Sequence, residues 1–211
     1  MTPEEASRKS RELCGLAPVI PVLVIDYTAD ARPIAEALVA GGLNVLEVTL
    51  RTPAALDAIR EMKTVPGAIV GAGTVLNEVD LRASIAAGAE FIVSPGLTQS
   101  LGLAAIEADI PFLPGIANAG DIMRGLDLGL SHFKFFPAES SGGIAALKAL
   151  AAPFGQCSFC PTGGITLASA PQWLAIDPVL CVGGSWVVPK GPVDATAIEV
   201  AARQAAGLAK G

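Results

Sequence analysis

Lys134 interrupts an otherwise apolar stretch of the sequence, which reads S-H-F-K-F-F-P-A-E from Ser131 to Glu139. Its three phenylalanines indicate a strand that enters a hydrophobic core, and Pro137 would end that strand. A lysine is rarely buried without a partner or a purpose. A desolvated amine gives up its proton readily and can then attack a carbonyl to form a Schiff base. An edge strand with an exposed lysine fits the same letters, so the remaining sequence must decide.

A second predicted strand carries polar groups that could work with such a lysine. In Val45–Arg51 the residues Glu47, Thr49 and Arg51 alternate with apolar ones, and alternate residues of a strand share a face. Water on one face would explain the pattern, but in a sheet covered by helices the polar face must point inward. Among the charged residues only Glu47, Arg51 and Lys134 fall in predicted strands. An amine, a carboxylate and a guanidinium that converge there favour a catalytic site.

One unit, a short apolar run followed by a turn and a segment of helical periodicity, recurs eight times along the chain. The predicted strands are Val19–Ile25, Val45–Arg51, Ala68–Thr74, Phe91–Pro95, Pro111–Pro114, His132–Phe136, Ser158–Pro161 and Val179–Val182. The predicted helices between and after them are Ala31–Ala40, Ala54–Met62, Glu78–Ala87, Ser100–Ala108, Asp121–Leu128, Ile144–Ala151, Ala168–Ala175 and Ala195–Ala209.

This alternation predicts an α/β protein with a parallel sheet, and the absence of any break in composition favours a closed (β/α)8 TIM barrel. We expect a single domain over residues 1–211, with an extra N-terminal helix within residues 1–16. An open doubly wound sheet fits less well, because no Gly-x-Gly-x-x-Gly follows the first strand. In such barrels the chemistry takes place at the carboxyl ends of the strands.

Glycines gather at several predicted strand ends. Gly71-Ala72-Gly73-Thr74 ends the third strand, Gly163-Gly164 follows the seventh and Gly183-Gly184-Ser185 follows the eighth. Bare backbone N–H groups after the seventh and eighth strands are where this fold commonly binds phosphate. Any one of these glycines could belong to a tight turn, but two adjacent strand ends together indicate an anion site.

Composition narrows the choice of partners. The net charge of −6 and the absence of a basic cluster argue against nucleic acid and anionic membranes as partners. No apolar run reaches the roughly 18 residues of a membrane span, and the charged start resembles a capped helix, so we expect a cytoplasmic protein.

A single histidine, His132, makes a metal site improbable, and the four cysteines are expected to be buried free thiols.

The motifs around the two central residues resemble those of a known family. G-L-N-V-L-E-V-T-L-R around Glu47 and F-K-F-F-P-A-E around Lys134 resemble the paired signatures of the 2-keto-3-deoxy-6-phosphogluconate (KDPG) and 4-hydroxy-2-oxoglutarate (KHG) aldolases. V-G-A-G-T-V-L, V-S-P-G, F-C-P-T-G-G-I and V-G-G-S-W add to the match. The similarity covers the chain from about Pro18 to Pro189, with the motifs in the same order.

The resemblance implies a class I aldolase on a trimeric (β/α)8 barrel that needs no cofactor or metal. Lys134 matches the Schiff-base lysine and Glu47 the general acid/base. The product pair would be pyruvate and glyceraldehyde 3-phosphate, a reaction of the Entner–Doudoroff pathway. The other implied contacts are Arg51 and Thr74 for the pyruvyl carboxylate, Pro95, Phe136 and Thr162 for the lining, and Gly163, Gly164, Gly184 and Ser185 for the phosphate. Small anionic substrates (a phosphorylated keto acid, pyruvate) and a homotrimer are the implied partners.

Two places depart from the family pattern. Asp26 follows the first strand where a basic residue is usual, and Ala117-Asn118 stands where a Ser or Thr is usual. The sequence therefore leaves open a phosphorylated or unphosphorylated substrate, and also the galactonate epimer of KDPG. From other classes, a metal-dependent pyruvate aldolase, a phosphosugar isomerase and a non-catalytic phosphate-binding barrel remain as rivals. For His132 we expect a structural or supporting role.

Overall fold

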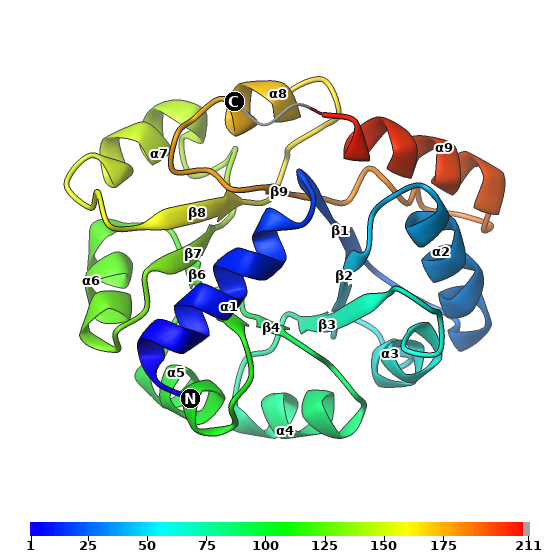
Figure 1. The fold of residues 1–211 in the computed structure, drawn as a ribbon, viewed down its shortest axis with the longest axis horizontal. Coiled ribbons are helices and arrows are strands. Elements are labelled where there is room, and N and C mark those ends of the chain that lie inside the picture. Colours follow the sequence, from blue (N-terminus) through cyan, green and yellow to red (C-terminus); the bar gives the residue numbers. More distant parts are fainter. Residues whose placement is uncertain (209–211) are drawn as a thin grey trace.

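The computed structural model describes residues 1–208, and its strands curl into a ring that helices surround (Figure 1). One sheet runs β5-β4-β3-β2-β1-β9 and a second runs β6-β7-β8, with parallel pairing throughout. Isolated bridges Phe159↔Val179 and Thr162↔Gly183 join the two sheets on one side, and β5 leads directly into β6 on the other. The predicted (β/α)8 barrel is therefore confirmed.

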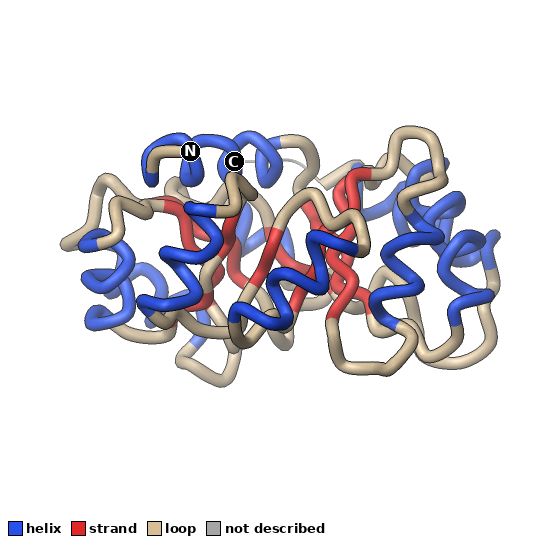
Figure 2. The backbone as a smooth tube through the Cα atoms, turned by 90° about the horizontal axis from the view of Figure 1, so that it is seen from below, coloured by secondary structure: helices blue, strands red, loops and turns tan. Residues whose placement is uncertain are grey.

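Strands occupy the inside of the molecule and helices the outside (Figure 2). The strands are β1 Val19–Leu23, β2 Val45–Thr49, β3 Ile69–Gly73, β4 Ile92–Val93, β5 Phe112–Leu113, β6 Gly115–Ile116, β7 His132–Phe135, β8 Ser158–Pro161 and β9 Val182–Gly184. The helices are α1 Pro3–Gly15, α2 Thr28–Ala40, α3 Ala55–Met62, α4 Glu78–Ala86, α5 Gln99–Glu107, α6 Ala119–Asp127, α7 Gly143–Ala151, α8 Ala170–Leu174 and α9 Ala195–Ala206.

Local sequence explains where several of these helices begin. Asn77, Thr98, Asn118 and Asp194 each accept a hydrogen bond from the backbone N–H three residues ahead, at the starts of α4, α5, α6 and α9. The Asn118 cap starts α6 at Ala119, two residues before the predicted start at Asp121, and the starts of α4 and α9 agree with the prediction. The last predicted residue of the final helix, Ala209, lies outside the described residues.

Two predicted strands need correction. The expected strand Pro111–Pro114 is the shorter β5, and a further strand that was not predicted, β6, begins directly after Pro114. Proline has no N–H for the ladder, and β5 and β6 on its two sides pair with different neighbours. The last strand is Val182–Gly184 and not Val179–Val182. Its position is set by pairing with β1, which begins at Val19 opposite Val182, so two glycines that are poor strand formers complete the ladder.

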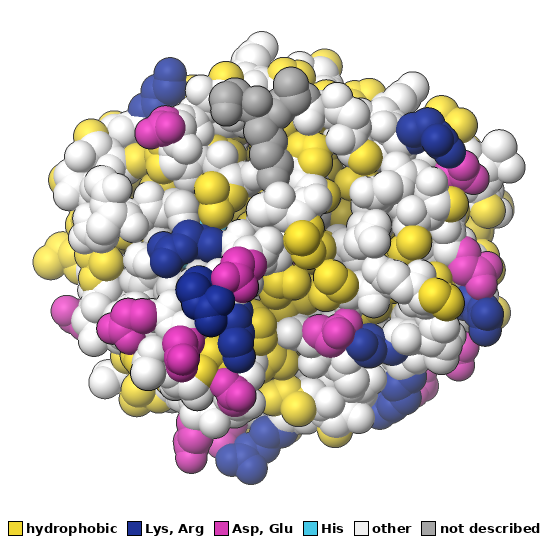
Figure 3. Space-filling model, in the orientation of Figure 1, with side chains coloured by type: hydrophobic (Ala, Val, Ile, Leu, Met, Phe, Trp, Pro, Cys, Tyr) yellow, Lys and Arg dark blue, Asp and Glu magenta, His cyan; other side chains and the backbone are white. Residues whose placement is uncertain are grey.

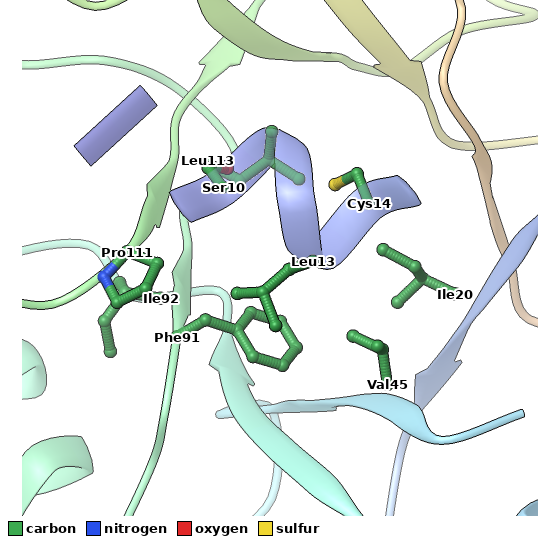
Figure 4. Close-up of a pocket in the computed structure, with 9 residues that line it drawn as sticks. All are labelled: Ser10, Leu13, Cys14, Ile20, Val45, Phe91, Ile92, Pro111 and Leu113. Atoms are coloured by element: carbon green, nitrogen blue, oxygen red, sulfur yellow. The ribbon is translucent and has the colours of Figure 1, made fainter. Parts of the chain in front are cut away.

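Helix α1 lies across the amino-terminal end of the ring (Figures 1 and 2). A capping box between Thr2 and Glu5, followed by proline at the first turn, fixes where it starts. Figure 4 shows Ser10, Leu13 and Cys14 of this helix facing apolar side chains at the amino-terminal ends of the strands. The cavity between them has a volume of about 10 Å³. This volume is room for about one water molecule, so α1 closes that end of the barrel.

The surface on the α1 side carries acidic and basic side chains interspersed with apolar ones (Figure 3). None of the helices in residues 1–208 is long and apolar enough to cross a membrane.

Candidate active site

Lys134 and Glu47 form a buried ion pair inside the ring of strands. Lys134 comes from β7 and Glu47 from β2, and Lys134 Nζ lies 3.0 Å from Glu47 Oε1 and 3.3 Å from Oε2. The two side chains are 6% and 4% exposed. The ammonium nitrogen also lies 5.4 Å from the centroid of the Phe136 ring. At this separation a proton can pass directly from the amine to the carboxylate, which would leave a neutral nucleophile in the lumen.

Two glycines of β3 leave space for larger side chains, Gly73 for Glu47 and Gly71 for Phe91. Strand β3 pairs with β2 so that Gly71 lies opposite Glu47 and Gly73 opposite Thr49. A Cβ on Gly73 would lie 2.7 Å from Glu47 Cγ, and one on Gly71 would lie 2.5 Å from the Phe91 ring. Sequence reasoning treated these glycines as anion contacts and missed this role. The signal was present in their spacing, because two residues of equal parity in a barrel strand face the lumen together.

The other two polar residues of the second strand are placed differently from Glu47. The Thr49 hydroxyl donates a hydrogen bond to the Leu23 carbonyl at 2.8 Å and so ties β2 to β1. Strand β2 ends at Thr49, and Arg51 follows it with an exposed side chain. Within residues 1–208 the Arg51 guanidinium makes no ion pair, so the expected contact with the Lys134–Glu47 pair is not made here. Arg51 stands at the carboxyl end of β2, where an incoming anion could reach it.

Thr74 and Pro95 flank the same carboxyl-terminal face. Thr74 follows β3 directly and has φ of 61°, in the left-handed region that a β-branched residue rarely adopts. Such strain is typically found at ligand sites, where the surrounding structure holds it in place. Pro95 follows β4, and its carbonyl lies against Gly115, the register partner of Lys134. Any side chain at Gly115 would overlap that carbonyl, so glycine lets the two loops meet beside the lysine.

The residues expected at the phosphate end lie after β8 and in β9. Thr162 is buried, and its Oγ1 lies 3.9 Å from Cys160 Sγ. A Cβ on Gly183 would lie 2.7 Å from Thr162 Cγ2, so β9 approaches this side chain closely. Gly163 and Gly164 both have positive φ, 105° and 80°, and form a turn that only glycine adopts without strain.

Gly184 completes β9, and Ser185 follows it with an exposed side chain. The Trp186 ring occupies the space that a Cβ on Gly184 would need. The strand end therefore presents backbone and the Ser185 hydroxyl beside this ring.

His132, the first residue of β7, is a buried polar residue outside the Lys134–Glu47 pair. His132 is buried, its Nδ1 lies 2.8 Å from Ser158 Oγ, and burial lowers its pKa from 6.5 to about 4. The imidazole is therefore neutral, and its Nε2 has no hydrogen-bond partner among residues 1–208, which fits the expected structural role.

All four cysteines are free and buried. Cys14 of α1 meets Cys160 and Cys181, and hydrogen bonding to Cys160 together with burial raises the pKa of the Cys14 thiol.

Comparison with known proteins assigns the family. The model of the family described as "KDPG and KHG aldolase" matches residues 11–202. The chain belongs to this family. It is 63% identical over 193 residues, 92% of this chain and 93% of the relative, to 2-dehydro-3-deoxy-phosphogluconate aldolase of Zymomonas mobilis.

Solved structures of KDPG aldolases also resemble the chain over most of its length. The Zymomonas mobilis enzyme with 3-phosphoglycerate superposes with a TM-score of 0.96 at 60% identity, covering 97% of this chain and 98% of that one. The Legionella pneumophila KDPG aldolase, with pyruvate captured at low pH as a covalent carbinolamine intermediate, gives a TM-score of 0.91 at 44% identity, covering 94% and 98%. In the present chain, one amine and one carboxylate, those of Lys134 and Glu47, lie in contact inside the barrel. Within residues 1–208 no group of three His, Cys, Asp or Glu side chains is arranged to hold a metal ion.

Proposed function

We propose that this protein is a class I aldolase, a lyase that cleaves KDPG into pyruvate and glyceraldehyde 3-phosphate. The observation that carries the proposal is the buried contact of 3.0 Å between Lys134 Nζ and Glu47 Oε1. A buried amine next to a single carboxylate supplies both a nucleophile for a ketone and a group that can move protons. Membership of the KDPG and KHG aldolase family supports the same reaction.

The first stage is formation of the Schiff base. Lys134 passes a proton to Glu47 and its Nζ attacks the C2 ketone of the substrate, which gives a carbinolamine. Glu47 returns that proton to the carbinolamine hydroxyl, which leaves as water, and the resulting iminium carries a positive charge next to the ionised Glu47. The Legionella pneumophila relative, with its carbinolamine of pyruvate, supports this sequence of steps.

The second stage breaks the C3–C4 bond. Glu47 takes the proton of the C4 hydroxyl, the C4 oxygen becomes the aldehyde carbonyl, and the electron pair of the C3–C4 bond moves into the iminium to form an enamine. Glyceraldehyde 3-phosphate leaves. Glu47 then returns the proton to C3, and water hydrolyses the pyruvyl iminium to release pyruvate and the free Lys134 amine. One carboxylate therefore acts as base and then as acid.

The two ends of the substrate need different contacts. We assign the pyruvyl carboxylate to Arg51 and Thr74, since a guanidinium binds a carboxylate through two parallel hydrogen bonds. Pro95, Phe136 and Thr162 would line the site. The phosphate would lie against Gly163, Gly164, Gly184 and Ser185, where three of the four residues have no side chain of their own to cover the backbone N–H groups. The 3-phosphoglycerate in the Zymomonas mobilis relative supports a place for a phosphorylated three-carbon compound in this family.

The test is steady-state cleavage of three substrates by the purified protein: KDPG, its galactonate epimer and KHG. We expect the highest kcat/KM for KDPG and lower but measurable turnover of KHG. Lys134→Arg, which keeps the charge but not the nucleophile, should abolish cleavage of all three substrates. Intact turnover in Lys134→Arg would contradict the Schiff-base mechanism, and a preference for the epimer would reassign the substrate.

We also propose a homotrimer. Exposed apolar side chains follow β1 and β3, namely Val24, Tyr27, Leu76 and Val79, and exposed apolar groups of this kind are typical of protein–protein contacts. Sedimentation should give three times the chain mass of 21.3 kDa. A mass equal to a single chain at micromolar concentration would contradict the proposal.

A cytoplasmic location is proposed as well. All four cysteines are free and buried, as in proteins of a reducing compartment. Cell fractionation with an antibody to the chain would test it, and recovery with periplasmic or secreted proteins would contradict it.

A further inference from the structure

Glu139 is an exposed acidic residue next to the turn that we assign to the phosphate, although a carboxylate repels a phosphate. It follows β7, four residues after Phe135. Two backbone hydrogen bonds join its loop to the loop after β8: Ala138 N–H donates to Thr162 O at 2.8 Å, and Glu139 N–H donates to Gly163 O at 3.1 Å. The position of Glu139 relative to the Gly163-Gly164 turn is therefore set by the backbone.

The side chain of Glu139 lies over that turn. A Cβ on Gly164 would lie 2.7 Å from both Cβ and Cγ of Glu139, so the aliphatic part of the glutamate packs directly against the glycine backbone. The carboxylate reaches beyond the turn, where Oε1 accepts a hydrogen bond from Trp173 Nε1 at 3.1 Å. Glu139 thus holds the turn between its own loop and helix α8.

Trp173 is a rigid anchor for this contact. It is fully buried, and its ring lies 6.4 Å from that of Phe135 in β7. The turn itself has no such rigidity of its own, because two successive glycines have more backbone freedom than any other pair of residues. A backbone that is to bind phosphate through its N–H groups must be held in one conformation before the ligand arrives.

We propose that Glu139, held by Trp173, is a positioning residue that fixes the Gly163-Gly164 turn and so sets the preference for phosphorylated substrates. The inference rests on the proposed function, which assigns the phosphate to this turn. The proposal explains why a carboxylate can lie next to a phosphate site: the carboxylate of Glu139 accepts the hydrogen bond of the Trp173 N–H. Substrates without a phosphate do not use the turn and should be indifferent to Glu139.

The experiment compares KDPG and KHG as substrates of the wild type, Glu139→Ala, Glu139→Gln, Trp173→Phe and the neighbouring Ser140→Ala. Glu139→Ala and Trp173→Phe remove the hydrogen bond from opposite sides, and each should raise KM for KDPG about tenfold while kcat and both constants for KHG change less than about twofold. Glutamine can still accept from the indole, so Glu139→Gln should restore KM for KDPG to the wild-type value or below it, because the repelling charge is gone. Ser140→Ala should resemble the wild type.

Equal losses on both substrates in Glu139→Ala, or an unchanged KM for KDPG, would overturn the inference. So would a Glu139→Gln variant as impaired as Glu139→Ala. The wild type is measured first and separates the two proposals: if it cleaves neither substrate, the proposed function is wrong. If it cleaves both with equal kcat/KM, only the phosphate turn and the role of Glu139 are wrong. Thermal unfolding of each variant shows whether it is folded. If Glu139→Ala does not fold, Glu139→Gln still tests the proposal.

Discussion

Replacing Gly73 by alanine would put a methyl group into the space of the Glu47 side chain. The new Cβ would lie 2.7 Å from Cγ and 2.8 Å from Cδ of Glu47, and nearer still to Oε1. Ordinary van der Waals contact begins at 3.4 Å, so Cγ would have to retreat by about 0.7 Å and the carboxylate by roughly 1 Å. A displacement of about 1 Å at a reacting group costs on the order of 100-fold in rate, and overpacking of this kind costs about 1–3 kcal/mol of stability.

We therefore expect Gly73→Ala to lower kcat for KDPG cleavage about 100-fold. Pyruvate release in steady state measures the rate, and urea unfolding shows that the variant is folded. Lys134 is untouched, so the variant should still form a covalent adduct with pyruvate. Gly155→Ala is the matched control, because a Cβ there meets nothing within 4 Å. A Gly73→Ala enzyme within twofold of the wild-type rate would refute the reasoning that this glycine makes the space for Glu47.

Three further results are expected. Glu47→Gln keeps the shape of the side chain but cannot take a proton, so stopped-flow and steady-state rates of cleavage should fall about 10²–10⁴-fold. Between pH 6.5 and 4 unfolded chains bind a proton at His132 that folded chains do not, because its folded pKa is about 4. The free energy of unfolding should then fall by about 3 kcal/mol more over that window in the wild type than in His132→Gln, and equal slopes in urea titrations would contradict this. Gly183→Ala should lower the free energy of unfolding by about 1–3 kcal/mol, since its Cβ would overlap Thr162, and an unchanged urea midpoint would be inconsistent with that overlap.

Much of the fold follows from the sequence because its main signals are local. Alternating strands and helices predict the parallel barrel, and strand parity predicts that Glu47 and Lys134 face inward. The structure brings these two side chains together, four strand positions apart around the ring. The strand pattern also predicts an inward side chain at Arg51, but β2 ends at Thr49 and Arg51 is exposed. The alternation of inward and outward side chains ends with the strand.

Other features depend on neighbouring strands and could not be predicted from one segment alone. The role of Gly73 requires the register between β2 and β3, and the extent of β9 is set by its pairing with β1. The contact between Glu139 and Trp173 spans 34 residues and two loops, and neither residue has a spacing or a motif that indicates the other. Such long-range contacts come from the assembled barrel.

The most direct measurement of the central claim is mass spectrometry after incubation of the protein with pyruvate and borohydride. Borohydride reduces an iminium to a stable secondary amine, and digestion then locates the modified residue. We expect one reduced pyruvyl group per chain, carried by Lys134, and no adduct in Lys134→Arg. An unmodified wild-type chain, or an adduct on another lysine, would contradict the claim that the buried amine beside Glu47 is the nucleophile.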